Sequence, residues 1–121
     1  MDRQAIFDWV KRRYGSQPDY PWFDNNAVLR HEDNRKWYGV ILEVERKKLG
    51  LNGEGFADVI NVKADPFLIG SLRMREGFLP AYHMNKERWI SILLDGTVPE
   101  EEIRDLIDLS YGLTQSKKKK R

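Results

Sequence analysis

The sequence predicts an α+β fold: a two-layer sandwich with helices on one face of an antiparallel five-stranded sheet, in the order α-β-β-β-α-β-β-α. Segments of helical periodicity stand near both ends and in the middle of the chain, and alternating strand-like segments lie between them. Most of these strand-like segments follow one another through turn sequences, which favours antiparallel pairing. The 121 residues are 40% hydrophobic, enough for one core without a metal or a disulfide.

The first helix is expected to begin after Asp2 and to run to Tyr14. Aspartate caps a helix because its carboxylate accepts a hydrogen bond from a free backbone N–H, and Gly15 provides the stop. Ile6 and Val10 fall on one helical stripe, which we expect to face the core.

Three strands are expected next, over residues 27–31, 37–44 and 56–63. The sequence EDNRK makes the first turn, and RKKLGLNGEG is a long, glycine-rich hairpin connection. The second strand is expected to turn four side chains to one face: Tyr38, Val40, Leu42 and Val44. In the third strand, Ile60 and Val62 are expected to point the same way.

The segment ADPFLIGSLRMREG predicts the middle helix, which is expected to end before Gly77. Asp65 is its N-cap, and Pro66 takes the first helical position, where a missing N–H costs nothing. Residues 79–83 and 89–94 then predict a second hairpin across the turn MNKER.

The segment TVPEEEIRDLIDLSYGL predicts the last helix. Thr97 and Glu100 have the spacing of a capping box, and three acids in the first turn suit the helix dipole. Five side chains form the stripe expected to face the core: Ile103, Leu106, Ile107, Ser110 and Tyr111.

The charge of the chain is concentrated at its end. The net charge is +2, but residues 117–121 are all basic; removing these five from the 21 Lys and Arg leaves 16 against 19 Asp and Glu, a net charge of −3. We therefore expect one domain over residues 1–115 and a disordered basic tail over residues 116–121. Cysteine is absent, and MDRQAIFDWV is unlike a signal peptide, so we expect a cytoplasmic monomer that does not enter a membrane.

The segments VKADPF and LPAYHMNKERWISILLDGTVPEEEIRDLIDLSY resemble, in this order, the MmcQ/YjbR family of small bacterial proteins. The resemblance is strong over residues 61–111 and weaker before them, where a helix, YPWF and strands correspond. It implies a fold similar to frataxin-like and secretion-chaperone-like α/β sandwiches. It also implies DNA binding, for which a double-wing arrangement of hairpins is proposed in the family.

The chain departs from the family pattern at two places. Residue 88 is Arg, where many members have His, which puts a shared histidine role there in doubt. Phe67, Leu68 and Ile69 follow Pro66, where an acidic residue is more usual. We expect these three side chains to form an apolar surface peculiar to this protein.

Two hairpin tips carry the candidate nucleic-acid contacts. Basic side chains can bind phosphate, an amide can orient the backbone, and an aromatic ring offers a stacking face. The candidates are Arg46, Lys47, Lys48, His83, Asn85, Lys86, Arg88 and Trp89.

A structural interpretation stands beside this one. Asn85 suits a turn because asparagine tolerates left-handed backbone. His83 could instead hydrogen-bond a neighbour, Trp89 could pack on the sheet, and the basic tips could be solvated loops.

Motifs for catalysis or metal binding are missing from the sequence. There is no phosphate-binding glycine loop, HExxH or nucleophile elbow, and the two histidines are far apart. Glu101, Asp105 and Asp108 share a face of the last helix without a fixed partner, so we interpret them as solvated. We expect no enzyme activity, cofactor or metal.

The leading hypothesis is a non-enzymatic DNA-binding module that contacts mainly the phosphate backbone. The alternative is a chaperone-like protein-interaction module that uses the sheet face or Phe67, Leu68 and Ile69. A continuous basic band over the hairpins would favour DNA, whereas an apolar groove on an acidic body would favour a protein partner. A deep pocket that joins His83 to convergent acids would favour a third reading, a small enzyme.

Overall fold

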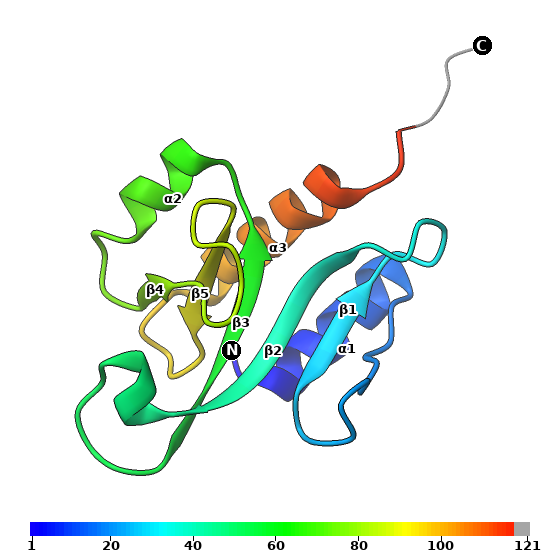
Figure 1. Cartoon of the computed structure of the whole chain (residues 1–121). Coiled ribbons are helices and arrows are strands. Elements are labelled where there is room, and N and C mark those ends of the chain that lie inside the picture. The colour runs from blue at the N-terminus through cyan, green and yellow to red at the C-terminus, as the bar shows by residue number, and fades with distance from the viewer. Residues whose placement is uncertain (118–121) are drawn as a thin grey trace.

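A computed structural model describes residues 1–117 of the chain (Figure 1). The elements, in chain order, are α1 (Arg3–Tyr14), β1 (Ala27–Arg30), β2 (Trp37–Glu45), the 3-10 helix η1 (Arg46–Leu49), β3 (Phe56–Lys63), α2 (Pro66–Leu72), β4 (Phe78–Pro80), β5 (Trp89–Leu93) and α3 (Glu100–Thr114). Within residues 1–117, the strands form one antiparallel sheet in the order β1-β2-β3-β5-β4. The predicted α+β fold and element order are confirmed. Of the expected tail, residues 116–121, the last four (118–121) lie outside the described residues.

The three helices bury their apolar side chains in one core, on one face of the sheet. Ile6 of α1, Ile69 of α2 and Ile107 of α3 belong to the same cluster. Ile60 and Val62 of β3 face this cluster, as predicted from their alternation. The opposite face of the sheet is turned toward the viewer in Figure 1, and we call it the open face.

The open face carries a second, smaller apolar cluster over the middle of the sheet: Val40, Leu42, Val44, Val59 and Leu93. Partly buried side chains from the hairpin connections cover it, among them Leu49, Tyr82 and Met84. This face is therefore covered by loops and not by helices. No helix within residues 1–117 has the length and apolar character needed to cross a membrane.

The predicted ends of α1 and the predicted start of α2 are confirmed. The Asp2 carboxylate accepts a hydrogen bond from the backbone N–H of Ala5, and Gly15 ends α1 with a φ of 74°. The Asp65 carboxylate accepts hydrogen bonds from two backbone N–H groups at the start of α2, and Pro66 is the first helical residue.

The predicted capping box of Thr97 and Glu100 is wrong. Helix α3 begins at Glu100 after Pro99, whose backbone is extended, and no side chain caps it. A residue before proline is disfavoured in helical backbone, so Val98 cannot continue a helix back to Thr97. The backbone N–H of Thr97 instead donates to the Asp95 carboxylate, 3.0 Å away.

Tyr38 faces the helices, which corrects the prediction that it shares a face with Val40. The pairing of β1 with β2 shifts between Leu29, opposite Gly39, and Arg30, opposite Trp37. The extra residue forms a β-bulge, and a bulge changes the side to which the strand turns its side chains. Tyr38 thus enters the helix-covered core, whereas Val40 stays on the open face.

Helix α2 and strand β4 both end earlier than expected. Helix α2 ends at Leu72, and residues 73–77 form turns before β4. Strand β4 ends at Pro80, because proline lacks the N–H that would continue the ladder. Residues 81–88 leave the sheet and form a turn in front of it, which we call the β4–β5 turn (Figure 1).

Candidate nucleic-acid interface

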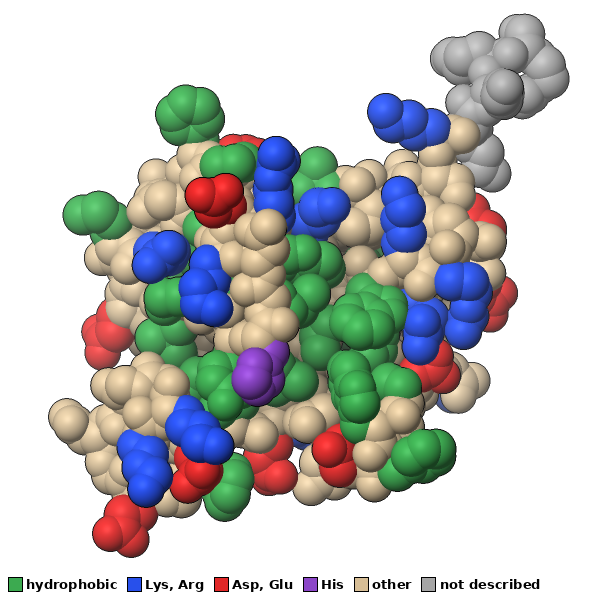
Figure 2. Space-filling model, in the orientation of Figure 1, with side chains coloured by type: hydrophobic (Ala, Val, Ile, Leu, Met, Phe, Trp, Pro, Cys, Tyr) green, Lys and Arg blue, Asp and Glu red, His purple; other side chains and the backbone are tan. Residues whose placement is uncertain are grey.

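The open face is hollowed beside β2. This hollow, which we call the open-face groove, has a volume of about 400 Å³. Its lining combines four aromatic rings with aliphatic and polar side chains: Trp22, Asp24, Asn26, Trp37, Val40, Leu42, Tyr82, His83 and Met84. Figure 2 shows apolar side chains gathered in a hollow on this side of the molecule, with Lys and Arg side chains on both sides of it.

The groove presents aromatic rings in two pairs. The Trp22 and Trp37 rings meet edge to face, with centroids 5.9 Å apart and an interplanar angle of 84°. The guanidinium of Arg30 lies 5.9 Å from the Trp37 ring centroid. Opposite them, the Tyr82 and His83 rings are 4.1 Å apart. Trp22 is 46% exposed, so part of its ring is open to a ligand.

The loop between α1 and β1 positions Trp22. Asp19 forms an isolated bridge with Val28, in which each backbone N–H donates to the other carbonyl. The Asp19 carboxylate also pairs with Arg30 at 2.8 Å. This anchor fixes the loop beside β1, so that Trp22 reaches the start of β2.

Two buried polar side chains hold the β4–β5 turn over the open face. The Asn61 amide donates to the carbonyl of Tyr82 at 3.0 Å, and the backbone N–H of Tyr82 donates to the Ser91 hydroxyl at 3.1 Å. The Ser91 hydroxyl in turn donates to the Asn61 side-chain oxygen. Both side chains are fully buried, and every bond they make here orders the turn.

Asn85 is engaged within the β4–β5 turn. Its side-chain oxygen accepts from the backbone N–H of Glu87 at 2.8 Å, and its carbonyl accepts from the N–H groups of Arg88 and Trp89. Asn85 is thus a turn residue, as in the structural interpretation, but the left-handed backbone of this turn is at His83 and not at Asn85. Trp89 is half-buried at the start of β5, opposite Lys63.

The cations of this turn point into solvent. Lys86 and Arg88 are exposed, and within residues 1–117 neither forms an ion pair. His83 is also exposed and has a left-handed backbone, with a φ of 61°. The turn therefore exposes the charges of Lys86 and Arg88 a few residues along the chain from His83, whose ring lines the groove.

The other predicted tip is ordered by η1. The Arg46 guanidinium donates to the carbonyl of Asn52 at 2.8 Å, and Lys48 pairs with Glu45 at 3.3 Å. Lys47 is exposed and has no ion-pair partner in the described part of the chain. Of the three predicted cations, Lys47 is thus the one without a side-chain bond within residues 1–117, although it lines a separate hollow with Glu45 and Glu54.

The structure brings the two tips together. Lys48 shares a smaller hollow, of about 200 Å³, with Tyr82 and His83, and these two rings also line the open-face groove. The hollow continues the groove toward η1. Acids stand in the same linings, Asp24 in the groove and both Glu43 and Glu45 in the hollow, and Lys48 is the only Lys or Arg of residues 1–117 in either. The two linings are therefore mixed in charge and do not form a continuous basic band.

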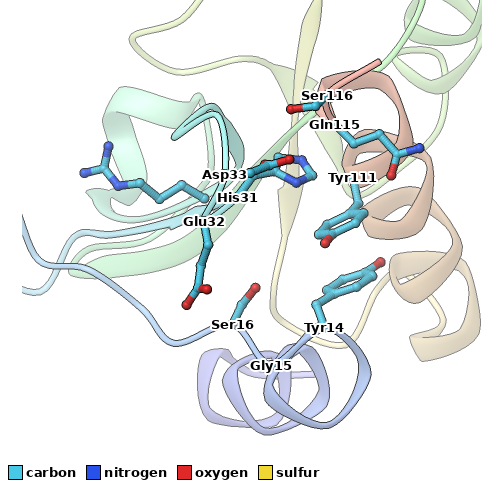
Figure 3. A pocket seen from close by; sticks show the side chains of 10 residues that line it. Tyr14, Gly15, Ser16, His31, Glu32, Asp33, Tyr111, Gln115 and Ser116 are labelled. Carbon is cyan, nitrogen blue, oxygen red and sulfur yellow. The ribbon is translucent and has the colours of Figure 1, made fainter. Parts of the chain in front are cut away.

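A second, polar hollow of about 570 Å³ lies where the ends of α1, β1 and α3 meet (Figure 3). The Tyr14 and Tyr111 rings stack 3.8 Å apart, and His31 lies 4.2 Å from the Tyr111 ring. The Tyr14 hydroxyl donates to the Asp108 carboxylate. Burial is the larger cause that raises the pKa of Tyr14, and this hydrogen bond is the second.

The histidine and tyrosine behind this hollow are buried. His31 Nε2 lies 2.9 Å from the Thr114 hydroxyl, and burial lowers the pKa of His31. Burial also raises the pKa of Tyr38 to about 12, and its hydroxyl has no hydrogen-bond partner in the described structure. Because Tyr14 and His31 bind Asp108 and Thr114 of α3, we assign this hollow to the packing of α1 and β1 against α3.

The acids of α3 do not converge on a metal site. Asp108, predicted to be solvated, pairs with Arg13 and Tyr14 of α1 instead. Within residues 1–117, no three His, Cys, Asp or Glu side chains are grouped so that they could hold a metal ion.

The sequence did not single out three of the residues that build this site. Trp22 lies in an irregular loop, where no periodicity predicts its direction. Asn61 and Ser91 left a readable signal, because each is a polar residue within an alternating apolar strand. Such a residue, when buried, needs a hydrogen-bond partner from another segment.

The fold and site together define a small α+β sandwich with a loop-covered, aromatic open face. The sequence model of the YjbR family matches residues 12–113, and the chain belongs to this family. Bacillus subtilis YyaQ is 50% identical over 117 residues, which cover 95% of this chain and 99% of YyaQ. Escherichia coli YjbR is 36% identical over 53 residues, 43% of this chain and 45% of that protein.

Solved structures show the same fold. A Pseudomonas syringae crystal structure, 46% identical, superposes with a TM-score of 0.92 over 95% of this chain and all of the other. A Deinococcus radiodurans protein, 26% identical, has a TM-score of 0.62 over 81% of this chain and 67% of its own.

Proposed function

We propose that this protein is a non-enzymatic nucleic-acid-binding module whose open face contacts the phosphate backbone. One observation carries the proposal: Lys48 of η1 lines the same hollow as Tyr82 and His83 of the β4–β5 turn, although the two segments are far apart in sequence. Two basic tips on the same face can contact successive phosphates of one strand.

The free cations supply the affinity in this proposal. Lys47, Lys86 and Arg88 are exposed and outside the ion pairs of residues 1–117, so they can bind phosphate without breaking an internal contact. Each phosphate neutralised releases condensed counterions, which makes binding weaken as salt rises. With acids in the floor of the hollow, we expect little affinity from long-range attraction and most of it from these local contacts.

A salt titration tests the proposal. Labelled single-stranded and duplex oligonucleotides would be titrated with the protein, with fluorescence anisotropy as the readout, at several salt concentrations. We expect binding at low salt that weakens steeply. Absence of binding to both, or unchanged binding after Arg46, Lys47, Lys48, Lys86 and Arg88 all become Ala, would contradict the proposal.

A second candidate function, protein docking, is favoured by a separate observation on α2. Phe67 is 93% exposed and Met74, one residue beyond the helix C-cap, is 87% exposed. The expected apolar surface of Phe67, Leu68 and Ile69 is wrong in part, since Ile69 is buried in the core and Leu68 packs against it. A contiguous exposed apolar patch is what marks an interaction site, and Phe67 and Met74 are the two candidates for such a patch at α2.

The docking candidate has its own test. A protein captured by the wild type should be lost when Phe67 and Met74 become Ser, and retained when Lys47, Lys86 and Arg88 become Ala. The reverse pattern would assign the captured partner to the open face.

A further inference from the structure

We infer that the open-face groove takes an unpaired nucleobase, so that the protein selects single-stranded nucleic acid over duplex. This inference rests on the proposed function and names its substrate class. It concerns the aromatic rings that line the groove, whereas the proposed function rests on the exposed cations Lys47, Lys86 and Arg88.

The ring geometry suits a flat ligand. Trp22 is partly exposed, and its ring stands almost perpendicular to the ring of Trp37. A flat ligand stacked on the face of Trp22 would therefore meet Trp37 edge to face. The faces and edges of aromatic rings carry opposite partial charge, which favours this corner for a third aromatic ring. Every nucleobase offers such a face when it is unpaired, but a base within a duplex is already stacked on both sides.

The polar groups around the groove also suit a base. Asp24 lines the groove, and its carboxylate already accepts from the backbone N–H and the side-chain amide of Asn26; its remaining lone pairs can accept from the N–H groups on the edge of a base. In a duplex these groups are paired with the opposite strand. No Lys or Arg of residues 1–117 lines the groove itself. Lys48 lines the adjoining hollow, where a phosphate flanking an inserted base would lie.

A cationic side chain is the competing occupant of the same groove. Asp24 lines the groove, and the Arg30 guanidinium, 5.9 Å from the Trp37 ring centroid, is already paired with Asp19. The test therefore includes a cationic peptide.

Both walls of the groove are held in place before any ligand binds. The Asp19–Val28 bridge anchors the loop of Trp22, and the buried Asn61 and Ser91 side chains anchor Tyr82 on the other wall. A preformed site loses less conformational entropy on binding, so stacking on it contributes more to affinity.

The test compares a single-stranded oligonucleotide with an abasic oligonucleotide of equal length, which keeps the phosphates and lacks the bases. We expect the wild type to bind the base-bearing strand more tightly than both the abasic strand and the duplex. Trp22→Ala should weaken binding of the base-bearing strand about 5- to 100-fold, as expected for the loss of one stacked base. It should leave the abasic strand unaffected, and Trp22→Phe should restore much of the affinity.

Phe67→Ala is the control, because it removes an aromatic ring that is more exposed than Trp22 but lies on α2, and it should change nothing. Equal binding of base-bearing and abasic strands would overturn the inference and leave the proposed function standing. Failure of every strand to bind would overturn both. Binding of an arginine-rich peptide that Trp22→Ala abolishes, with no effect of Trp22→Ala on the base-bearing strand, would assign the groove to a cationic partner instead.

Discussion

The double variant Lys47→Ala, Lys86→Ala removes one free cation from each tip, and we expect it to lower the salt dependence of binding. Neither side chain forms an ion pair within residues 1–117, so each can neutralise one phosphate. The slope of log affinity against log salt is about −0.7 per phosphate for a single strand, so the variant should reduce its magnitude by about 1.4.

The assay is the anisotropy titration of a labelled single strand at several salt concentrations, which gives the slope directly. The matched control is Lys11→Ala, Arg12→Ala, which removes two exposed cations from α1, on the helix-covered side of the sheet. This control should change the slope little, because these charges lie away from the open face. Equal reductions in both variants would refute the assignment of the contacts to the two tips.

Three further predictions concern stability and local order. Gly77→Ala should lower the free energy of unfolding by about 3 kcal/mol in urea denaturation, because the added Cβ would lie 2.6 Å from a Val98 methyl and the φ is +93°. His31 should titrate below 6.5 by NMR, and stability should fall as pH drops below 6.5, because the unfolded chain then binds the proton that the buried ring excludes. Arg46→Ala should speed amide exchange at Leu51, whose N–H donates to the Arg46 carbonyl in the loop that the Arg46 guanidinium holds through the Asn52 carbonyl.

Each of these has a control or a contradicting result. Gly112→Ala, where the added Cβ meets nothing within 4 Å, should raise stability by up to about 1 kcal/mol. If both glycine variants behave alike, the close approach at Gly77 is not the cause. A His31→Gln variant that keeps the full acid sensitivity of the wild type would refute the role of His31. Unchanged exchange in Arg46→Ala would show that η1 is ordered by its backbone alone.

The order of elements could be predicted because local chemistry and tertiary packing agree over most of the chain. The Asp65–Pro66 start of α2 and the full length of β3, residues 56–63, follow from capping and from alternation. Where two local signals compete, the sequence misleads. Thr97 and Glu100 have capping-box spacing, but Pro99 lies between them and restricts Val98, so the proline decides where α3 begins.

The faces of the strands were harder to predict than their positions. Tyr38 alternates correctly with Val40 in sequence, and only the shift in pairing beside Arg30 turns it toward the helices. A bulge depends on the partner strand, and the partner is not visible in the local pattern.

The candidate site was predicted in part. The sequence located the basic tips, but it could not show that Arg46 is held by Asn52 and Lys48 by Glu45, while Lys86 remains free. These differences depend on side-chain contacts within and between loops. The aromatic groove was missed because Trp22 reaches Trp37 only through the bridge that folds its loop onto β1.

The central claim is that nucleic acid binds on the open face. Its most direct test is an NMR titration of isotope-labelled protein with a single-stranded oligonucleotide at low salt. The claim predicts chemical-shift changes in the amides of residues 81–88 and 46–49 and in the indole N–H signals of Trp22 and Trp37, with α1 and α3 unchanged. Shifts confined to α1, α2 or α3, or no shifts at all, would contradict it.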